Sequence, residues 1–351
     1  MSIAPIILAD APAIAGLIFR PLRGVEDADA LHAIHVGRKD HDGVDPLSTM
    51  ESLPSRDQVL ASLSKAVVEN QHDQYLVAQV GERVIGYSRI QSWPEGDGTW
   101  VYLTLGWVLP EWRGKGIGTA MLHWTEERIR RLAAAEHPNE KCEFAANASS
   151  TEKEATSLLL HEGYRAGYTM LEMGFYVSGP APVHPLPSGI NVRPVLPEHY
   201  PLIAASVRDA YQHEYEGGRF NEESDFDLAA YAAQLSAPKH DPALWQVAWD
   251  GNQIAGQVLS VVENGRAEVF EVSVRPAWRR RGLGRALVSR AVHGLRTRGI
   301  DVIRLHTNSD FRTRAKDLYH SVGFRVLIEF PRYRKAFNGR VTPQNGSHYA
   351  R

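Results

Sequence analysis

The chain has 351 residues, of which 43% are hydrophobic and 23% charged, and its formal net charge is −2. This composition is typical of a globular protein, and the length suits roughly two domains at about 150 residues each. Because the chain is nearly neutral, it has no global positive field that would attract nucleic acid or an anionic membrane. The single cysteine, Cys142, excludes an internal disulfide framework and suits a reducing compartment.

The apolar segment at residues 3–19 comes first in chain order, and it does not resemble a secretory signal. It has no basic start, and Asp10 and Pro12 interrupt it. No uninterrupted apolar run in the sequence approaches the ~20 residues that span a bilayer. We therefore expect a cytoplasmic protein with no membrane partner.

Four segments of the first half recur in the same order in the second half. The matching pairs are FRPL (19–22) with VRPV (192–195), YLVAQVGERVIGYSRI (75–90) with WQVAWDGNQIAGQVLS (245–260), VLPEWRGKGIG (108–118) with VRPAWRRRGLG (274–284), and FAANASS (144–150) with LHTNSD (305–310). The last pair is followed by Gly-Tyr at 163–164 and by Gly-Phe at 323–324. We infer two copies of one domain of about 165–170 residues.

Each copy predicts the same order of elements: a strand, helices, about three strands that include a hairpin, a glycine turn, a helix, a strand, a helix and a final strand. This order indicates an α/β fold with two tandem domains, each a mixed, mostly antiparallel twisted sheet flanked by helices. Four prolines in residues 178–189 predict an extended linker. We expect an N-terminal domain at 1–178, a linker at 179–189 and a C-terminal domain at 190–351.

The glycine turn of each copy follows a strand ending in Val-x-Pro and precedes an amphipathic segment. In the second copy, apolar residues at helical spacing share one face, namely Leu287, Val288, Ala291, Val292 and Leu295. The first N–H groups of such a helix lack partners within it and bind an anion well, above all a pyrophosphate. Glycines let the backbone approach the phosphates closely, and the arginines of the second turn add charge-assisted contacts.

The turns do not fit two other phosphate-binding patterns. They have no G-x-x-x-x-G-K-[ST] motif, and Met121 and Leu287 stand where a dinucleotide fingerprint has its third glycine. Two alternatives are a helix start that binds no ligand and a basic patch for nucleic acid. The second is disfavoured because no aromatic residues interleave the basic run and the chain is nearly neutral.

The turns fit the pattern Arg/Gln-x-x-Gly-x-Gly/Ala, with Arg113, Gly116 and Gly118 in the first copy. This pattern, followed by an Asn strand end, a helix and Gly-Tyr/Phe, resembles the acetyl-CoA pyrophosphate loop of the GNAT superfamily of N-acetyltransferases. The resemblance covers nearly the whole chain, and the duplication is similar to that of tandem members such as mycothiol synthase. It implies acetyl-CoA as cosubstrate, with no metal.

The resemblance also implies which residues contact acetyl-CoA. In the second copy these are Val272, Ser273, Val274, Arg279, Arg280, Arg281, Gly282, Leu283, Gly284, Arg285 and Asn308. In the first copy they are Val108, Arg113, Gly114, Lys115, Gly116, Ile117, Gly118 and Thr119.

Acetyl transfer to an amine needs a base that takes a proton from the amine and an acid that protonates the thiolate. In the second copy the resemblance assigns these roles to Glu268 and to Tyr319, four residues before a Gly-Phe pair. Period-two alternation places Phe270 and Val272 on the face of Glu268, and apolar neighbours would raise the pKa of its carboxyl. Glu271 is the rival base, on the opposite face unless a bulge brings it inward. The plainer alternatives are an exposed strand carboxylate and a packing tyrosine.

The first copy has neither group. Counting back from Val108 and from the Gly-Tyr pair places Tyr102 and Leu159 at the positions of base and acid, although Asn147 is retained. We therefore expect a first copy that is catalytically silent and can still bind CoA.

The acceptor is expected over the first helices of the second copy, where residues 207–231 are acidic and aromatic. Tyr211, Glu214 and Tyr215 are its candidate contacts, and such a lining favours a cationic amine; a solvated acidic loop is the alternative. We expect an N-acetyltransferase acting on a primary amine of a small molecule, as a monomer or homodimer. The alternatives are acetylation of a protein or peptide amine and a non-catalytic acyl-CoA-binding regulator. Mycothiol's precursor, a polyamine, an antibiotic and an amino acid all remain open as acceptors.

Two further motifs do not indicate chemistry. Residues 35–45 resemble a metal loop, but the EF-hand pattern fails because no glutamate stands at its twelfth position. Cys142 has no counterpart in the second copy, so we expect a small packing residue and not a nucleophile.

Overall fold

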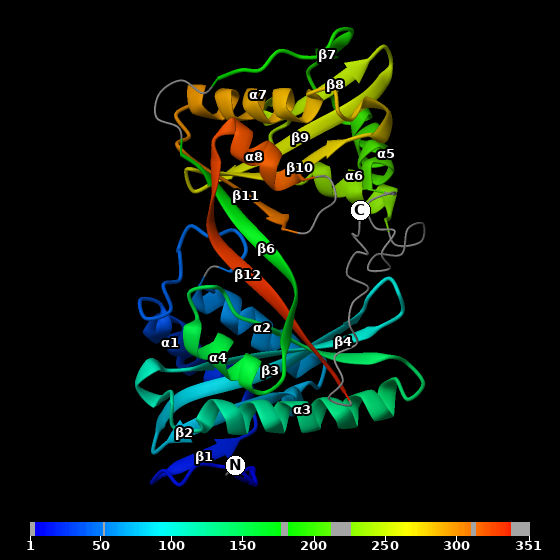
Figure 1. The fold of residues 1–351 in the computed structure, drawn as a ribbon. Coiled ribbons are helices and arrows are strands. Elements are labelled where there is room, and N and C mark those ends of the chain that lie inside the picture. The colour runs from blue at the N-terminus through cyan, green and yellow to red at the C-terminus, as the bar shows by residue number, and fades with distance from the viewer. Residues whose placement is uncertain (1–3, 52, 177–181, 212–225, 310–313, 338–351) are drawn as a thin grey trace, which may run out of the picture. The chain divides into compact units, whose positions relative to one another are not determined.

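A computed structural model describes residues 4–51, 53–176, 182–211, 226–309 and 314–337 (Figure 1). The chain forms two compact units. The first, here the N-terminal unit, comprises Met1–Pro46, Glu51–Tyr168 and Phe330–Arg351, and the second, the C-terminal unit, comprises Leu47–Met50 and Thr169–Glu329. The predicted domains are contiguous in sequence, whereas each compact unit includes a segment from the other half of the chain.

The N-terminal unit is a mixed sheet with helices on both faces. Its elements are β1 (Leu17–Arg20), α1 (Ala28–Arg38), α2 (Arg56–Val68), β2 (Tyr75–Val80), β3 (Arg83–Pro94), β4 (Trp100–Val108), α3 (Ile117–Glu136), β5 (Cys142–Asn147) and α4 (Lys153–His161). The strand order is β1-β2-β3-β4-β5, and only the β4–β5 pair is parallel among these described strands. Along β2, Val77 packs with α1 and α2 while Leu76 and Ala78 pack with α3, so these helices cover opposite faces.

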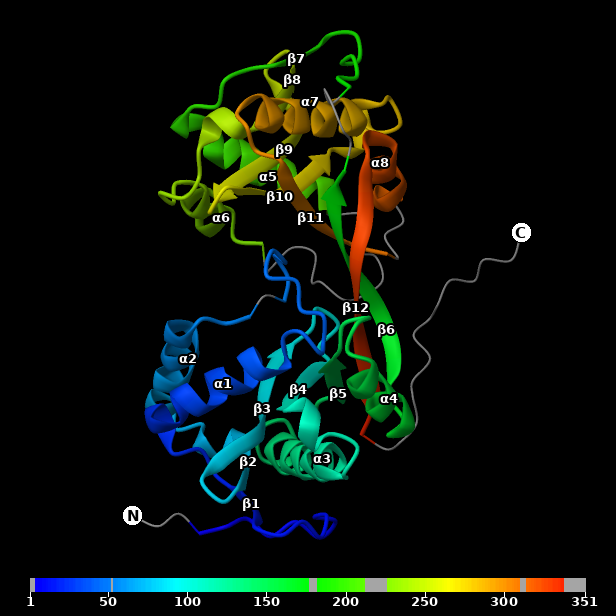
Figure 2. The same ribbon diagram turned by 90° about the vertical axis from the view of Figure 1, so that its left-hand side faces the viewer.

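The C-terminal unit repeats this arrangement. Its elements are β7 (Ile190–Val192), α5 (Tyr200–Tyr211), α6 (Leu228–Leu235), β8 (Gln246–Asp250), β9 (Gln253–Glu263), β10 (Arg266–Val274), α7 (Leu283–Thr297), β11 (Val302–Asn308) and α8 (Ala315–Val322). The strand order is β11-β10-β9-β8-β7, with β10 and β11 parallel. Figure 2 shows the same ribbon from a second side. The expected α/β fold of two tandem domains with mixed, mostly antiparallel sheets is confirmed.

Two long strands pass from one unit into the other. β6 (Arg165–Phe175) leaves the N-terminal unit after Tyr168, and its second half pairs with β11. β12 (Phe324–Ala336) runs the opposite way, and its residues Arg332–Ala336 pair with β5. The two halves of the chain thus exchange their last strands. Hydrophobic alternation predicts a final strand in each copy but does not encode which sheet it joins.

Short 3-10 turns complete the described elements: η1 (Gly24–Asp27), η2 (His72–Gln74), η3 (Pro110–Trp112), η4 (Pro197–His199), η5 (Pro242–Leu244) and η6 (Pro276–Trp278). The helix after the second glycine turn, α7, buries the predicted apolar face, including Leu287, Ala291 and Leu295. None of the helices in the described ranges combines the length and apolar composition needed to cross a membrane.

Candidate active site

The parallel strands β10 and β11 separate at the centre of the C-terminal unit. Their register runs from Arg266↔Val302 to Val269↔Leu305 and ends there, although both strands continue. The rest of β10 therefore offers backbone N–H and C=O groups on this side that are not paired with β11. The same divergence occurs in the N-terminal unit, where the β4–β5 register ends at Thr104↔Ala146.

A β-bulge interrupts β10 beside this opening. Glu268 lies opposite Val261 of β9, and Glu271 lies opposite Leu259, so that Phe270 is the extra residue. Because Val261 and Leu259 are two apart, Glu268 and Glu271 share one face of the sheet. The expectation that Phe270 and Val272 share the face of Glu268 is wrong, and the bulge considered as an alternative brings Glu271 onto that face.

Glu268 is the more open of the two carboxylates. Its side chain is 23% exposed, and its Oε1 lies 3.5 Å from Nδ1 of His306 on β11. Burial raises the pKa of the Glu268 carboxyl above its usual value, with His306 and Arg266 acting in the opposite direction. A carboxylate with a raised pKa is a stronger base than an ordinary glutamate, and its place beside the opening between β10 and β11 suits it to accept a proton from a bound amine.

Glu271 is buried against the helices. The Tyr211 hydroxyl of α5 donates to Glu271 Oε1 over 3.1 Å. Burial, together with the Glu271 carboxylate, raises the pKa of Tyr231 on α6 well above its usual value. Glu271 therefore holds α5 and α6 against β10. Of the predicted acceptor contacts, Tyr211 is found here, while Glu214 and Tyr215 lie outside the described residues.

Tyr319 lies in α8, where it is 6% exposed and packs edge-on against Phe324. Gly323 ends the helix in the left-handed conformation, with φ of 119°. The Gly-Phe pair of the sequence pattern is thus a helix C-cap that fixes the turn after Tyr319. Asn308 is the last residue of β11, and the sequence pattern places an asparagine at this strand end.

The second glycine turn has the backbone that its sequence requires. Gly282 caps α7 in the left-handed region, with φ of 82°. A Cβ on Gly284 would lie 2.8 Å from Leu318 Cδ1 of α8, so the glycine lets α8 pack closely against the start of α7. Gly282 thus serves the left-handed turn and Gly284 the contact with a side chain of α8, and the N–H groups at the start of α7 have no partners within the helix.

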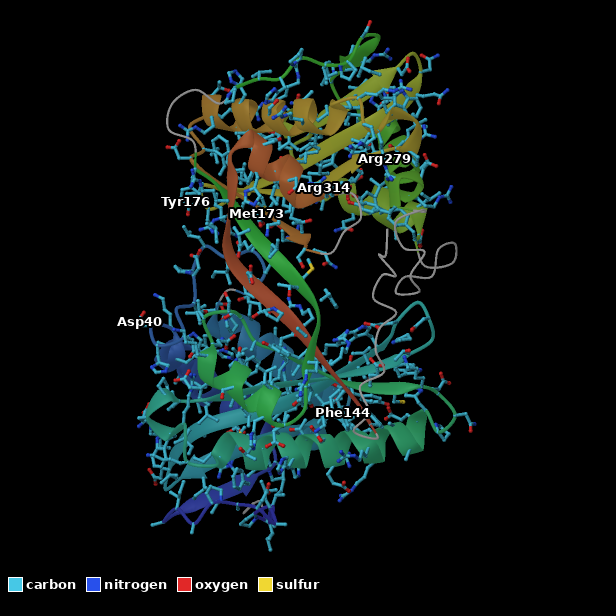
Figure 3. All side chains as sticks on the ribbon, viewed as in Figure 1. Asp40, Phe144, Met173, Tyr176, Arg279 and Arg314 are labelled. Atoms are coloured by element: carbon cyan, nitrogen blue, oxygen red, sulfur yellow. The ribbon has the colours of Figure 1, made fainter. Side chains whose placement is uncertain are left out.

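The four arginines of this turn divide into two kinds. Arg279, labelled in Figure 3, donates from Nε to the Val274 carbonyl over 2.9 Å and from Nη2 to the Ala210 carbonyl. It clamps the turn to β10 and α5. Arg280, Arg281 and Arg285 are exposed, and their contacts with CoA stay a prediction. The remaining predicted contacts lie in two places. The part of β10 beyond its pairing with β11 contains Val272, Ser273 and Val274, and the first turn of α7 contains Leu283.

The glycine turn of the N-terminal unit carries a buried ion-pair network. Arg113 donates to the Val108 carbonyl over 2.9 Å, as Arg279 does in its own unit. Both its terminal nitrogens also donate to Asp42, at 2.5 and 2.9 Å. Asp42 is 1% exposed and pairs with Arg38 of α1 at 3.0 Å, and Arg38 pairs with Glu152 at 2.8 Å. The network therefore joins α1, the turn and the start of α4.

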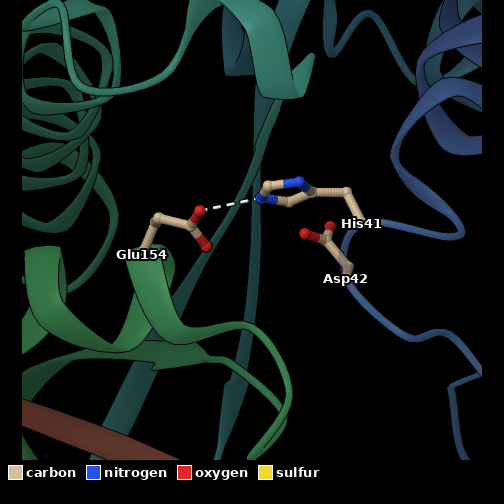
Figure 4. Close-up of side chains that lie close together, drawn as sticks. All are labelled: His41, Asp42 and Glu154. Carbon is tan, nitrogen blue, oxygen red and sulfur yellow. Dashed lines mark hydrogen bonds and ion pairs between the residues drawn. The ribbon is translucent and has the colours of Figure 1, made fainter.

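His41 and Glu154 flank the same carboxylate (Figure 4). The His41 ring bonds Glu154 over 2.8 Å, and both Asp42 oxygens already accept from arginines. Burial alone would raise the pKa of Asp42, but Arg113 and Arg38 together hold it below its usual value. Asp42 is therefore the centre of an ion-pair network that His41 and Glu154 extend to the surface.

The segment before β1 covers the first glycine turn. A Cβ on Gly116, whose φ is 84°, would lie 3.5 Å from Pro12 Cβ. The His123 ring bonds Asp10 over 2.5 Å and Glu162 over 2.8 Å, which ties this segment to α3 and to the end of α4. Of the remaining predicted contacts, Gly114 has φ of 68°, Lys115 stacks over the Trp112 ring, Ile117 is buried, and Gly118 and Thr119 lie in α3.

The proton-transfer positions of the N-terminal unit hold packing residues. β4 pairs with β3 in unbroken register from Gly86↔Val108, without a bulge. The ladder therefore places Leu103, and not Tyr102, where Glu268 stands; the expected equivalence is off by one residue. Leu103 and Tyr102 are both buried, and Leu159 is buried in an apolar cluster of α4. Burial raises the pKa of Tyr102 well above its usual value.

One contact was not anticipated from the sequence. His306 lies beside Glu268, and its position two residues before Asn308 on one strand is the signal that could have identified it. Cys142 is half-buried, and burial raises the pKa of its thiol.

Comparison with known proteins identifies the family. The sequence model described as the acetyltransferase (GNAT) family matches residues 45–142 and residues 204–324. The chain belongs to this family. Each matched range lies in a different copy of the duplicated domain, so the resemblance to tandem GNAT proteins is confirmed, and the chain is an acetyltransferase enzyme. Acetyl-CoA is the acyl donor of the GNAT family.

Curated relatives match over most of their length. The mycothiol acetyltransferase of Cellulomonas flavigena is 28% identical over 311 residues, covering 85% of this chain and 82% of that protein. The mycothiol acetyltransferase of Kineococcus radiotolerans is 30% identical over 258 residues, covering 72% and 78%.

Solved structures show the same tandem GNAT fold. A GCN5-related N-acetyltransferase from Sphaerobacter thermophilus has a TM-score of 0.69 at 21% identity, covering 92% of this chain and 96% of that one. A tandem GNAT protein from the clavulanic acid biosynthesis pathway has a TM-score of 0.61 at 14% identity, covering 92% and 98%.

Proposed function

We propose that the chain transfers the acetyl group of acetyl-CoA to a primary amine of a small molecule, and that this occurs in the C-terminal unit. The observation that carries the proposal is the asymmetry between two similar sites. Both units have diverging strands and a glycine turn, but only the C-terminal unit has a carboxylate and a tyrosine at the proton-transfer positions.

In the proposed arrangement, the start of α7 holds the pyrophosphate of CoA. Backbone N–H groups of the Gly282 turn donate to it, and the exposed Arg280, Arg281 and Arg285 add positive charge. Asn308 and the edge of β10 that faces away from β9, residues 272–274, hold the pantetheine arm. The main-chain N–H near Val274 polarises the thioester carbonyl.

The chain's own groups would move two protons. Glu268 takes a proton from the acceptor ammonium, and the amine nitrogen then forms a bond to the acetyl carbon as the carbon–sulfur bond breaks. Tyr319 gives its hydroxyl proton to the departing thiolate, and the second proton that the new amide nitrogen loses restores the tyrosine hydroxyl. Placing both reactants beside each other supplies much of the remaining acceleration.

The acceptor is proposed to be a cationic small molecule. Glu268 and Glu271 lie on one face beside Tyr211, a lining that favours a positively charged amine. The similarity to mycothiol acetyltransferases over more than four-fifths of the chain supports the amine precursor of mycothiol as the first acceptor to test.

Thiol release tests the proposal. The chain is incubated with acetyl-CoA and a panel of amines, namely the mycothiol precursor, a polyamine, an aminoglycoside and amino acids, and free CoA is measured with a thiol reagent. We expect amine-dependent release that Glu268→Gln lowers by ~10²-fold or more, the usual contribution of a general base. Glu263→Gln, at an exposed carboxyl on β9, is the matched control and should leave the rate unchanged.

Two outcomes would overturn the proposal. Tight binding of acetyl-CoA without turnover of any amine would indicate a non-catalytic binding protein. A fully active Glu268→Gln with an inactive Glu271→Gln would make the buried carboxylate the base.

A further inference from the structure

Charged side chains form a row across three neighbouring strands of the C-terminal unit. Glu268 of β10 is in register with Arg304 of β11, and His306 of β11 lies opposite Glu172 of β6. Arg304 and His306 are two residues apart, so their side chains share the face on which Glu268 lies. This row crosses the sheet at the point where β10 and β11 separate.

His306 is the nearest of these groups to the proposed base. Its Nδ1 lies 3.5 Å from Glu268 Oε1, and within the described part of the chain no other cationic side chain is within ion-pair distance of Glu268. The His306 side chain is 37% exposed, against 23% for Glu268. Because the β10–β11 register ends at Leu305, His306 is the first residue of β11 beyond that pairing.

Two other cationic side chains act on Glu268 from farther away. Arg266, on the same strand, donates to the carbonyls of Leu47 and Ser48, at 2.5 and 3.2 Å, which turns its guanidinium aside. Lys239, from the loop after α6, contributes a weaker attraction. Neither contacts the carboxylate, so neither fixes its orientation.

Glu172 supplies the opposing charge. It is fully buried and accepts from Ser48 Oγ at 2.5 Å and from the Thr49 N–H at 2.9 Å. Its carboxylate contributes to the raised pKa of Glu268. His306 thus lies on the strand between the two carboxylates, with Glu172 on β6 at one side and Glu268 on β10 at the other.

We propose that His306 is a positioning residue that orients Glu268 and carries its proton to solvent during acetyl transfer. This inference rests on the proposed function. Glu268 takes one proton from the acceptor ammonium and passes it to Nδ1 of the neutral imidazole. The imidazolium loses one proton from its other nitrogen to water, and exchange of the ring protons with water then returns the imidazole to the tautomer whose Nδ1 is unprotonated. Each turnover thereby moves one proton from acceptor to solvent and returns Glu268 to its ionised form.

Carbon-13 NMR of labelled glutamate tests the coupling without any acceptor. The Glu268 side-chain carboxyl signal is assigned by its loss in Glu268→Gln, and its titration is compared between wild type and His306→Gln. Removing the imidazolium removes an attraction for the carboxylate, so the Glu268 midpoint should rise by about one pH unit in the variant. An unchanged midpoint would overturn the proposal whether or not acetyl transfer is observed.

The rate profile tests the proton path. A base must be unprotonated, so the acid limb of kcat/KM should move to higher pH by about one unit in His306→Gln, about a tenfold loss below the limb. His293→Gln, an exposed histidine on α7, is the control and should leave the profile unchanged. A uniform loss of rate with an unmoved limb would make His306 merely structural.

A double variant separates the two proposals. Because His306 acts through Glu268, the variant carrying both Glu268→Gln and His306→Gln should be no slower than Glu268→Gln alone. Independent, multiplying losses would overturn the relay. Absence of turnover in every variant, with a shifted Glu268 midpoint, would instead refute the proposed function and leave the coupling standing.

Discussion

Asp42→Asn should destabilise the N-terminal unit strongly. Asp42 is 1% exposed and pairs with Arg113 and Arg38, whose side chains are 16% and 9% exposed. Removing one partner of a buried pair leaves an uncompensated charge and costs about 3–5 kcal/mol. Since Arg38 keeps Glu152 at 2.8 Å, we expect the lower end, about 3 kcal/mol.

Thermal and urea unfolding followed by circular dichroism measures this loss. In a domain of 150–250 residues, about 3 kcal/mol corresponds to a fall in Tm of roughly 6–12 °C. Asp29→Asn is the control, because Asp29 and its partner Arg56 are both exposed, and its Tm should equal that of wild type. A loss for Asp42→Asn below about 1 kcal/mol, the size of a surface pair, would refute the argument from burial.

The pH dependence of stability provides an independent check that the ion pairs lower the pKa of Asp42. The arginines hold the pKa of folded Asp42 below its usual value of about 3.9, so its contribution is present above that value. The stability gap between wild type and Asp42→Asn should be constant from pH 7 to 5 and shrink as the pH falls through the lowered pKa. A gap that grows on acidification would contradict the assigned direction.

Three further predictions concern the two units. Tyr319→Phe should lower the rate of CoA release by ~10²-fold without changing acetyl-CoA affinity, measured by steady-state kinetics and calorimetry; an unchanged rate would leave Tyr319 a packing residue. Gly284→Ala should destabilise the chain by no more than about 1 kcal/mol in urea unfolding, because its Cβ would meet only the movable end of the Leu318 side chain, whereas a loss above about 3 kcal/mol would show a rigid contact. Because Pro12 lies over Gly116 and Asp42 holds Arg113, calorimetry should find one acetyl-CoA per chain, abolished by Gly282→Val and unaffected by Gly116→Val; two per chain would support the sequence-based expectation that the first turn binds CoA.

The sequence predicts the glycine turns because they are local. The left-handed backbone at Gly116 and Gly282 and the buried face of α7 depend on residues within a few positions of each other. Duplication strengthens this inference, since each copy independently shows the same strand, turn and helix.

The structure adds what depends on pairing between distant segments. The bulge at Phe270 is a property of the β9–β10 ladder, and it changes which residue of β4 corresponds to Glu268. The partner of Arg113 is a carboxylate that lies 71 positions earlier in the chain, at Asp42. Neither alternation nor motif spacing specifies such contacts, because both are set by how the elements pack.

The exchange of β6 and β12 has a consequence for how the molecule can be divided. A gene fragment that begins at the proline-rich segment encodes every element of the C-terminal unit from β7 onward, but it omits the strand that pairs with β11. The fragment would present an unpaired sheet edge and be prone to aggregate. During synthesis, β5 cannot pair with β12 until about 185 more residues have been made, which is the separation of the paired residues Asn147 and Arg332. The two halves are therefore copies in sequence, yet the sheet of each is extended by a strand from the other half.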